Sequence, residues 1–481
     1  MKRWVRKFQI GAFSFLLIWI VLSGMGNCQD DELLKNPREM TFPPLSFNLP
    51  KAERTVLSNG MVVYLLENPE LPLIRLSALI RTGSVFDPPG LAGLAGLTAR
   101  VLRNGGTLYQ TPPAINQALE MIGAQIEFSM EMEWASAFLF ARQQDFPRVL
   151  SIFADLLIEP GFDPFQVDLA KKAAIEAIRR SNDNAEEVAY REFRRALYRG
   201  NPRGEISNME SVERIQREDL IAFYRRFFQP NNIILGISGD FKKKEMIESL
   251  EKAFRGWSRA LIELPSIPLP SPQEGKSIYY VSKDLPQSTI LLGHLSLPFN
   301  HPDYFPFQVL NFILGGAGFN SRLTQEIRSN QGLAYAVGSF YRGRPGYGVF
   351  GTFCQTKSKS THRVISLLWE IIEGMKKNPP GPELLEWAKN ALINQFIFSF
   401  TSSAEVVRQQ MKLEYDALPD DYLEKYQERV SAVTLEDLDR AARGHLLLEK
   451  SILMVVGKEE DFDQPLSSFG AVQQIELKKY P

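Results

Sequence analysis

The second half of the chain repeats the spacing of the first half. Asp219 precedes a strand-like run that closes at Gly239, and Asp437 precedes a similar run that closes at Gly457. Both members of the second pair lie 218 positions after their counterparts, without a gap. Near the start of each half a Leu-Pro pair precedes a strand-like run, and these two pairs lie 214 positions apart. Repeated spacing of this kind indicates an internal duplication, so both halves should have the same fold.

Each half combines strand patterns with helix patterns. An Asn59-Gly60 turn joins two strand-like runs over residues 53–66, and residues 124–133 alternate between apolar and polar side chains. Such alternation predicts an antiparallel strand with one buried face. Amphipathic helices are expected over 146–157 and 163–181. The predicted fold class is α+β: two homologous lobes, each a mixed, mostly antiparallel sheet backed by helices on one face.

The N-terminal segment has the layout of a secretory signal. A positively charged start is followed by an uncharged apolar run over residues 10–22 and then by small residues. The run is short for a membrane span, which needs roughly 20 apolar residues, although an uncleaved anchor is the alternative. We therefore expect export to the periplasm, with a signal peptide over residues 1–28.

The remaining boundaries follow from proline content. Residues 29–50 are polar and proline-containing, which indicates an extended arm. Residues 263–275 hold four prolines, which fix φ and lack an amide donor, so this segment should be a stiff linker. The N-terminal lobe is then expected over 51–262, the C-terminal lobe over 276–470, and a tail over 471–481.

Composition argues against some partners. The formal net charge is -1 and hydrophobic residues make up 44% of the chain, as in soluble globular proteins. Such a balance gives no bulk attraction to nucleic acid, so no nucleic-acid partner is expected. No transmembrane domain is expected after signal removal.

Cys28 and Cys354 are the only cysteines and predict no disulfide framework. Cys28 lies just after the apolar run and its small residues and is a candidate for a lipid anchor, although Gly26-Asn27 before it is a poor match to that pattern.

Histidines are few and scattered. The four are His294, His301, His362 and His445, so none lies in the first half, and no two lie within five positions of each other. A catalytic zinc needs three ligands from His, Cys, Asp or Glu, two of which commonly sit one helical turn apart. The sequence offers no such pair. The lone histidines are therefore expected to be satisfied core or surface residues.

A helix is expected within the stretch 93–107, entered through Pro88-Pro89-Gly90 and stopped by Gly105-Gly106. The segment from Arg81 to Thr107 resembles the one that carries the zinc motif of the pitrilysin/insulinase metallopeptidases, family M16. The resemblance covers nearly the whole chain after residue 50. It implies a LuxS/M16 metallopeptidase-like clamshell of two lobes around a cavity, and zinc-dependent endopeptidase activity in the members that have the metal.

The resemblance also shows what this chain lacks. The family's His-x-x-Glu-His motif falls on Gly96, Ala99 and Arg100, and its third ligand, a glutamate, falls on Ala177. A shifted register would use Gly93, Gly96 and Leu97 instead; neither register supplies a ligand. Arg100 would place a permanent cation where the zinc ion would lie. We therefore expect no catalytic residues, no metal ligands and no cofactor in this chain.

A second part of the family's site is present. The segment from Phe319 to Val337 resembles the "SRL…R…GLAY" signature of the family's C-terminal lobe. The resemblance implies that Arg328 and Tyr335 hold the substrate's scissile peptide. A guanidinium and a phenol can both donate hydrogen bonds to a carbonyl and stabilise a developing oxyanion. Gly315-Gly316-Ala317-Gly318 before them is expected to be a flexible loop with exposed amides. The alternative is a solvated helix residue and ordinary strand packing.

In this family the two parts of the site can be divided between two chains. This sequence has the pair and lacks the zinc motif, which predicts the zinc-less subunit of a processing-peptidase-like heterodimer that binds peptide and complements a zinc-bearing M16 homologue. Zinc is then expected only in the partner subunit. Two alternatives stay open: a non-enzymatic scaffold or peptide-binding subunit of an envelope complex, and an autonomous peptidase with an unrecognised metal site.

Overall fold

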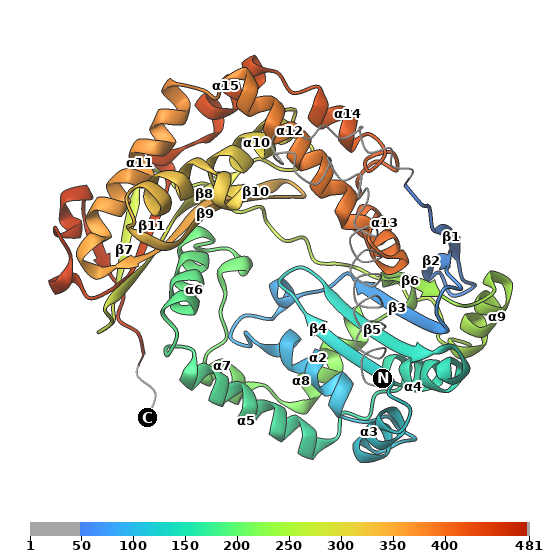
Figure 1. Cartoon of the computed structure of the whole chain (residues 1–481). Helices are drawn as coiled ribbons and strands as arrows, with labels where there is room; N and C mark the ends of the chain where they lie inside the picture. Colours follow the sequence, from blue (N-terminus) through green and yellow to red (C-terminus); the bar gives the residue numbers. More distant parts are fainter. Residues whose placement is uncertain (1–48, 479–481) are drawn as a thin grey trace, which may run out of the picture. The chain divides into compact units, whose positions relative to one another are not determined.

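The computed structural model describes residues 49–478 (Figure 1). The expected signal peptide, Cys28 and nearly all of the expected arm lie outside the described residues. Within the described part, the chain forms two six-stranded mixed sheets, one from each half. This confirms the α+β class and the two homologous lobes. No helix of residues 49–478 is both long and apolar enough to cross a membrane.

The first sheet has the strand order β1-β2-β6-β3-β5-β4. Its strands β2 and β6 are parallel and the other neighbours are antiparallel. The strand bounds are β1 Glu53–Val56, β2 Val62–Glu67, β3 Leu73–Ile80, β4 Gln125–Met130, β5 Ala135–Arg142 and β6 Ile233–Gly239. One face packs on helices α2 Leu94–Asn104, α3 Pro112–Glu120, α4 Phe146–Ile158, α5 Pro164–Arg180, α7 Met209–Arg214, α8 Arg217–Phe227 and α9 Lys243–Ala253.

The second sheet repeats this order as β12-β7-β11-β8-β10-β9. Its strands are β7 Ser277–Ser282, β8 Gln287–Ser296, β9 Ala334–Arg344, β10 Tyr347–Lys357, β11 Ile452–Gly457 and β12 Val472–Gln474. Its own helices are α10 Tyr304–Asn311, α11 Thr361–Lys377, α12 Pro382–Ile397, α14 Tyr426–Ser431 and α15 Leu435–His445. The edge strand is the exception to the repeat: β12 runs parallel to β7, whereas β1 is antiparallel to β2. The residues expected to be a tail thus include a strand.

The repeated Asp residues have a local role. Asp219 is the third residue of α8, where its side chain accepts from the backbone N–H of Gln216, and Asp437 accepts in the same way from Thr434 at the start of α15. Both are capping boxes, which satisfy backbone donors that a helix start leaves unpaired. The repeated spacing between Asp219 and Asp437 therefore marks two equivalent helix starts.

Each half also contributes one helix that packs on the sheet of the other half. Helix α6, Ala185–Leu197, places Val188 and Phe193 in one buried cluster with Met454 of the second sheet. Helix α13, Ser403–Tyr415, places Val407 and Met411 against Tyr64 and Ile234 of the first sheet. Figure 1 shows both helices lying on the opposite half's sheet. Each sheet therefore has helices on both faces, and the expectation of helices on one face only is wrong.

The two exchanged helices are copies of each other. Their first residues, Ala185 and Ser403, are 218 positions apart, the offset found in the sequence. Each begins after a polar side chain that caps the first turn, Asn184 or Ser402. Because the exchange is reciprocal, both sheets belong to one compact unit. Without the helix from the other half, one face of each sheet would be left uncovered.

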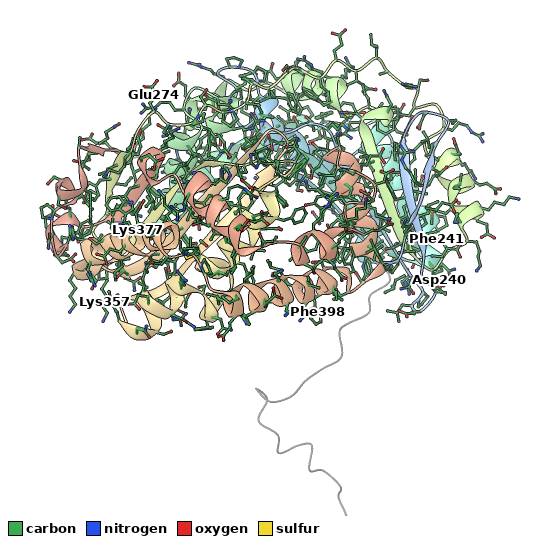
Figure 2. The ribbon with its side chains drawn as sticks, turned by 90° about the horizontal axis from the view of Figure 1, so that it is seen from above. Asp240, Phe241, Glu274, Lys357, Lys377 and Phe398 are labelled. Atoms are coloured by element: carbon green, nitrogen blue, oxygen red, sulfur yellow. The ribbon has the colours of Figure 1, made fainter. Side chains whose placement is uncertain are left out.

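The proline-containing segment has no helix or strand over residues 263–275, as expected for an extended linker. It is held in place by side chains of the first half: the carbonyl oxygen of Pro268 accepts from Asn201 at 2.8 Å and from Arg203 at 2.8 Å. Figure 2 places Glu274, in this segment, and Phe398, after α12, at opposite margins of the molecule. The linker is therefore an ordered surface connection.

Candidate functional site

The helix expected to carry the zinc motif is α2. It begins after Gly93, whose φ of 105° lies in the left-handed region that favours glycine. The carboxylate of Asp87 accepts from the backbone N–H of Gly93 at 2.7 Å and of Ala95 at 2.8 Å. Burial raises the pKa of Asp87 to about 6, and these backbone bonds oppose the rise. The first turn of α2 is therefore fixed by one enclosed carboxyl group.

At the positions where the zinc motif was expected, the side chains on α2 offer no lone pair to a metal. Gly96 is exposed, with open space where a side chain would lie; Ala99 is buried; and Arg100 is exposed. In the shifted register Leu97 is part of the hydrophobic core. Helix α5 lies beside α2 and presents the exposed methyl group of Ala177. Hydrogen, methyl and guanidinium groups do not fit a zinc ion, which takes imidazole, thiolate or carboxylate ligands.

Glu176 is the nearest carboxylate in sequence to the missing third ligand. It pairs with Arg180 at 2.7 Å on the surface of α5, and Arg179 lies 3.8 Å away. The stretch is therefore a solvated helix face. Glu176 is engaged in that surface pairing and does not replace the missing ligand.

The second half gathers Arg328 and Tyr335 into one exposed cluster. The guanidinium carbon of Arg328 lies 4.7 Å from the ring centre of Phe319 and 5.8 Å from that of Tyr335. Tyr335 is 78% exposed and Phe319 66% exposed. Within residues 49–478 no carboxylate pairs with Arg328 and no hydrogen bond engages the Tyr335 hydroxyl. Both polar groups are therefore available to a ligand.

The elements that carry the cluster are firmly anchored. Arg328 lies in the π-helical turn η7, Thr324–Asn330, and Tyr335 lies at the start of β9. The hydroxyl of Thr324 donates to the carbonyl oxygen of Val337 at 3.2 Å, and Leu333 N–H donates to the carbonyl oxygen of Ile327 at 2.9 Å. Since Ile327 is fully buried, the turn presents Arg328 from a rigid base. The exposed side chain of Tyr335 is not packed within the sheet, so the alternative of ordinary strand packing is wrong for this residue.

Two details of this region differ from the sequence expectation. The glycine-rich segment is not a simple loop, because Phe312–Gly316 forms a π-helical turn and Gly315 is buried. A side chain at Gly315 would lie 2.3 Å from the backbone nitrogen of Ser339, so close packing explains this glycine. Phe319 is the part of the site that sequence reasoning missed. Its position just before the Ser-Arg-Leu signature was the available signal.

The histidines divide into two groups. His294 is buried, with Nδ1 bonded to the carbonyl oxygen of Leu295 at 2.8 Å and Nε2 accepting from Leu447 N–H at 3.1 Å. His362 stacks on Phe469 at the surface. These two are satisfied residues, as expected. His301 and His445 instead converge on Asp303, an arrangement that the sequence did not predict because the two histidines are 144 positions apart.

Cys354 is a buried free thiol, and burial raises its pKa to about 12.

Family models match most of the described chain. Residues 62–208 match the model described as Insulinase (Peptidase family M16), and residues 214–392 match the one described as Peptidase M16 inactive domain. The chain belongs to peptidase family M16. Its M16 relatives include an uncharacterized zinc protease of Rickettsia bellii, 24% identical over 70% of this chain and 80% of that protein. A mitochondrial-processing peptidase subunit beta of Schizosaccharomyces pombe, named as probable, is 24% identical over 64% of this chain and 70% of that protein.

Solved M16 structures have the same fold. A peptidase M16 inactive domain from Pseudomonas fluorescens superimposes with a TM-score of 0.79 at 24% identity, covering 87% of this chain and all of that one. A protease from Helicobacter pylori gives 0.76 at 20% identity, covering 85% of this chain and all of that one. The periplasmic protease PqqL from Escherichia coli gives 0.71 at 13% identity, covering 87% of this chain and 48% of that one. At these identities the likeness establishes the fold.

Proposed function

We propose that this chain is a zinc-less M16 subunit that binds peptide and completes the active site of a zinc-bearing M16 partner. The observation that carries the proposal is the Arg328–Phe319–Tyr335 cluster, with both aromatic rings exposed, in a chain that has Gly96, Ala99, Arg100 and Ala177 where the family's metal ligands fall. Free donor groups on a rigid base suit the recognition of a peptide carbonyl. They can act on the bond being cleaved only if another chain supplies the metal.

The chemistry of the two donors defines their roles. Arg328 carries a permanent charge with several N–H donors, and the aromatic rings beside it limit its movement. The Tyr335 hydroxyl donates a single hydrogen bond. Directed at a peptide carbonyl, both donors would bind the substrate and stabilise the negative charge that develops on its oxygen. The attacking water and its activation would belong to the partner.

A heterodimer in the periplasm is the setting that we propose. One relative is named as the beta subunit of a mitochondrial-processing peptidase, which supports subunit pairing, and one structural neighbour is named as a periplasmic protease. The signal-like layout of residues 1–28 supports export, with Cys28 as a candidate lipid-attachment site. Cell fractionation and mass spectrometry of the mature N-terminus test both points. An intact, cytoplasmic N-terminus would contradict them.

The test of function is reconstitution. The chain is expressed alone and together with a zinc-bearing M16 homologue from the same genome, and cleavage of a peptide library is measured. We expect no cleavage by the chain alone and cleavage by the pair. In the pair, Arg328→Ala and Tyr335→Phe should each lower kcat by about 10²-fold or more, the usual effect of losing one oxyanion donor.

Matched controls separate site effects from folding effects. Arg363→Ala and Tyr109→Phe alter an exposed arginine and an exposed tyrosine outside the cluster, and they should leave cleavage unchanged. If the pair is active and both cluster variants keep full activity, the chain is a scaffold or a peptide-binding module of a larger complex. Cleavage by the chain alone would instead show an autonomous peptidase.

A further inference from the structure

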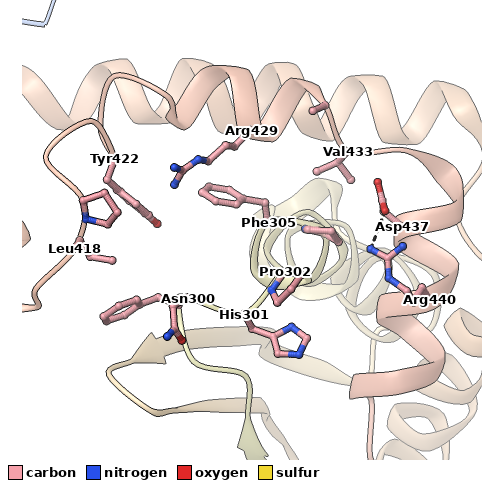
Figure 3. A pocket seen from close by; sticks show the side chains of 14 residues that line it. Asn300, His301, Pro302, Phe305, Leu418, Tyr422, Arg429, Val433, Asp437 and Arg440 are labelled. Carbon is pink, nitrogen blue, oxygen red and sulfur yellow. Dashed lines mark ion pairs between the residues drawn. The ribbon is translucent and has the colours of Figure 1, made fainter.

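Three donor side chains from separate parts of the second half meet beside a cavity. His301 and Asp303 lie in the connection between β8 and α10, and His445 is the last residue of α15. One ligand atom of each lies within 4.8 Å of the other two. The two imidazole rings are 5.2 Å apart. Figure 3 shows His301 at the wall of a cavity of about 510 Å³.

Asp303 is the centre of the cluster. One of its carboxylate oxygens, Oδ2, accepts from Nε2 of His445 at 2.8 Å. The other, Oδ1, accepts from Arg440 at 2.8 Å and 2.6 Å. Arg440 also pairs with Asp437 at 2.7 Å, so its charge is shared between two carboxylates. Arg440 thus orients one oxygen of Asp303 and leaves the other facing the imidazole, as outer-layer groups do for metal-ligating carboxylates.

The donor set suits a borderline divalent cation. Two imidazoles and one carboxylate are ligands that Zn²⁺ accepts in tetrahedral sites. Bonds of about 2.0 Å in a tetrahedron separate neighbouring ligand atoms by about 3.3 Å. The 2.8 Å distance between His445 Nε2 and Asp303 Oδ2 is close to that value. A cation between His445 Nε2 and Asp303 Oδ2 would replace the proton that these two atoms share. The C-terminal end of helix α15 also favours positive charge at His445.

His301 must change its hydrogen bonding to join. Its Nδ1 accepts from the backbone N–H of Asp303 at 3.0 Å, and this bond competes with metal binding by the same ring. His301 is only partly buried, so its ring can rotate at the cavity wall. Breaking one neutral hydrogen bond has a small net cost, which lowers the affinity of such a site and does not abolish it.

We propose that His301, Asp303 and His445 form a zinc site in the second half. The ion would join the β8–α10 connection to the end of α15 and would leave a fourth coordination position open to the cavity. The site lies on elements other than α2 and α5, so it is independent of the missing peptidase zinc and of the proposed function. The bound ion would stabilise the second half.

The test measures zinc binding by the full chain. Protein stripped with a chelator is dialysed against Zn²⁺, and bound metal is counted by atomic emission. We expect about one Zn²⁺ per chain and a rise in Tm on zinc addition. His301→Ala and His445→Gln should each weaken binding at least tenfold and remove the Tm rise. Glutamine at 445 keeps a donor for Asp303, which protects the fold.

Two controls make the outcome decisive. His362→Ala removes the partly exposed histidine that stacks on Phe469, and Glu176→Ala removes one carboxylate of α5. Both variants should bind zinc as the unaltered chain does. The proposal is overturned if the chain binds no stoichiometric zinc in molar excess. It is equally overturned if His301→Ala and His445→Gln bind as tightly as the unaltered chain.

Discussion

The hydroxyl of Tyr347 donates a hydrogen bond to the carboxylate of Glu133 at 3.2 Å, and the two residues are 214 positions apart. The same offset separates the two Leu-Pro pairs near the start of each half. The bond joins the β4–β5 connection of the first half to the first residue of β10 in the second half. Arg203 completes the contact: it pairs with Glu133 at 2.7 Å, bonds the Tyr347 hydroxyl at 3.1 Å and holds the linker carbonyl of Pro268. We refer to Glu133, Arg203 and Tyr347 as the inter-lobe latch.

Loss of the arginine should loosen the latch. Arg203→Ala leaves the largely buried carboxylate of Glu133 without its partner, and breaking a buried ion pair in this way costs about 3–5 kcal/mol. Denaturant unfolding followed by tryptophan fluorescence should show a lower unfolding free energy. Because the latch joins both lobes and the linker, the transition should also broaden. The double variant Arg203→Met with Glu133→Gln should recover most of the loss, and a cost below about 1 kcal/mol for Arg203→Ala would contradict the role of the latch.

Gly236 should be intolerant of a side chain. An added methyl group on β6 would lie 2.4 Å from Val407 and 2.1 Å from Met411, the residues by which α13 packs on the first sheet. Gly236→Ala should therefore destabilise the protein by about 1–3 kcal/mol, as overpacking does. Gly374→Ala is the control, since this helical glycine has nothing within 4 Å. That change should be neutral or stabilising by up to about 1 kcal/mol, measured in the same denaturant titration. Equal stability of the two variants would argue against the exchanged packing.

Restoring the ligands should restore a metal site on α2 and α5. The variant with Gly96→His, Ala99→Glu, Arg100→His and Ala177→Glu should gain about one Zn²⁺ per chain beyond the content of the parent. Open space at Gly96 and the exposure of Arg100 leave room for both imidazoles. A variant without the change at Ala177 should bind more weakly. If the full variant gains no metal, the alignment of the motif with Gly96 and Arg100 is wrong.

His294 should make stability depend on pH. Burial lowers the pKa of His294 to about 4 from an ordinary value near 6.5, although the hydrogen bond to the Leu295 carbonyl oxygen and the charge of Glu449 oppose this shift. Between these values the unfolded chain binds a proton that the native chain does not. Stability contributed by His294 is thus complete above pH 6.5 and is lost as pH falls toward 4, by roughly 3 kcal/mol in total. Denaturant titrations over this range should show a shallower slope for His294→Gln, while His362→Gln keeps the slope of the unaltered chain.

Much of the fold was open to sequence reasoning because local signals were strong. The turn at Asn59-Gly60 predicted a hairpin, and β1 and β2 flank it. The apolar run that ends at Gly239 predicted β6, whose strand bounds agree to within a residue. The sequence could not predict the exchange of α6 and α13 between the two halves. Val188 and Met411 form ordinary apolar helix faces, and nothing in their spacing says which sheet covers them.

Part of the candidate site was also predictable from the sequence, and part of it was found only in the structure. Arg328 and Tyr335 were identified from a motif, since they lie seven positions apart in one short connection that brings both into a single cluster. The part that Phe319 has in that cluster appeared only in the structure. The convergence of His301, Asp303 and His445 was equally hidden, because the contact joins the start of α10 to the end of α15.

By itself, the sequence determined the duplication, many of the helices and strands, and the occurrence of Gly96, Ala99, Arg100 and Ala177 at the positions where the resemblance places the metal ligands. These properties depend on residue identity and on spacing along the chain. The tertiary structure decided which helix covers which sheet, the latch between Glu133 and Tyr347, and the meeting of distant histidines on Asp303. Those contacts depend on how apolar faces are buried across the two halves, and burial of that kind is set by the whole folded chain.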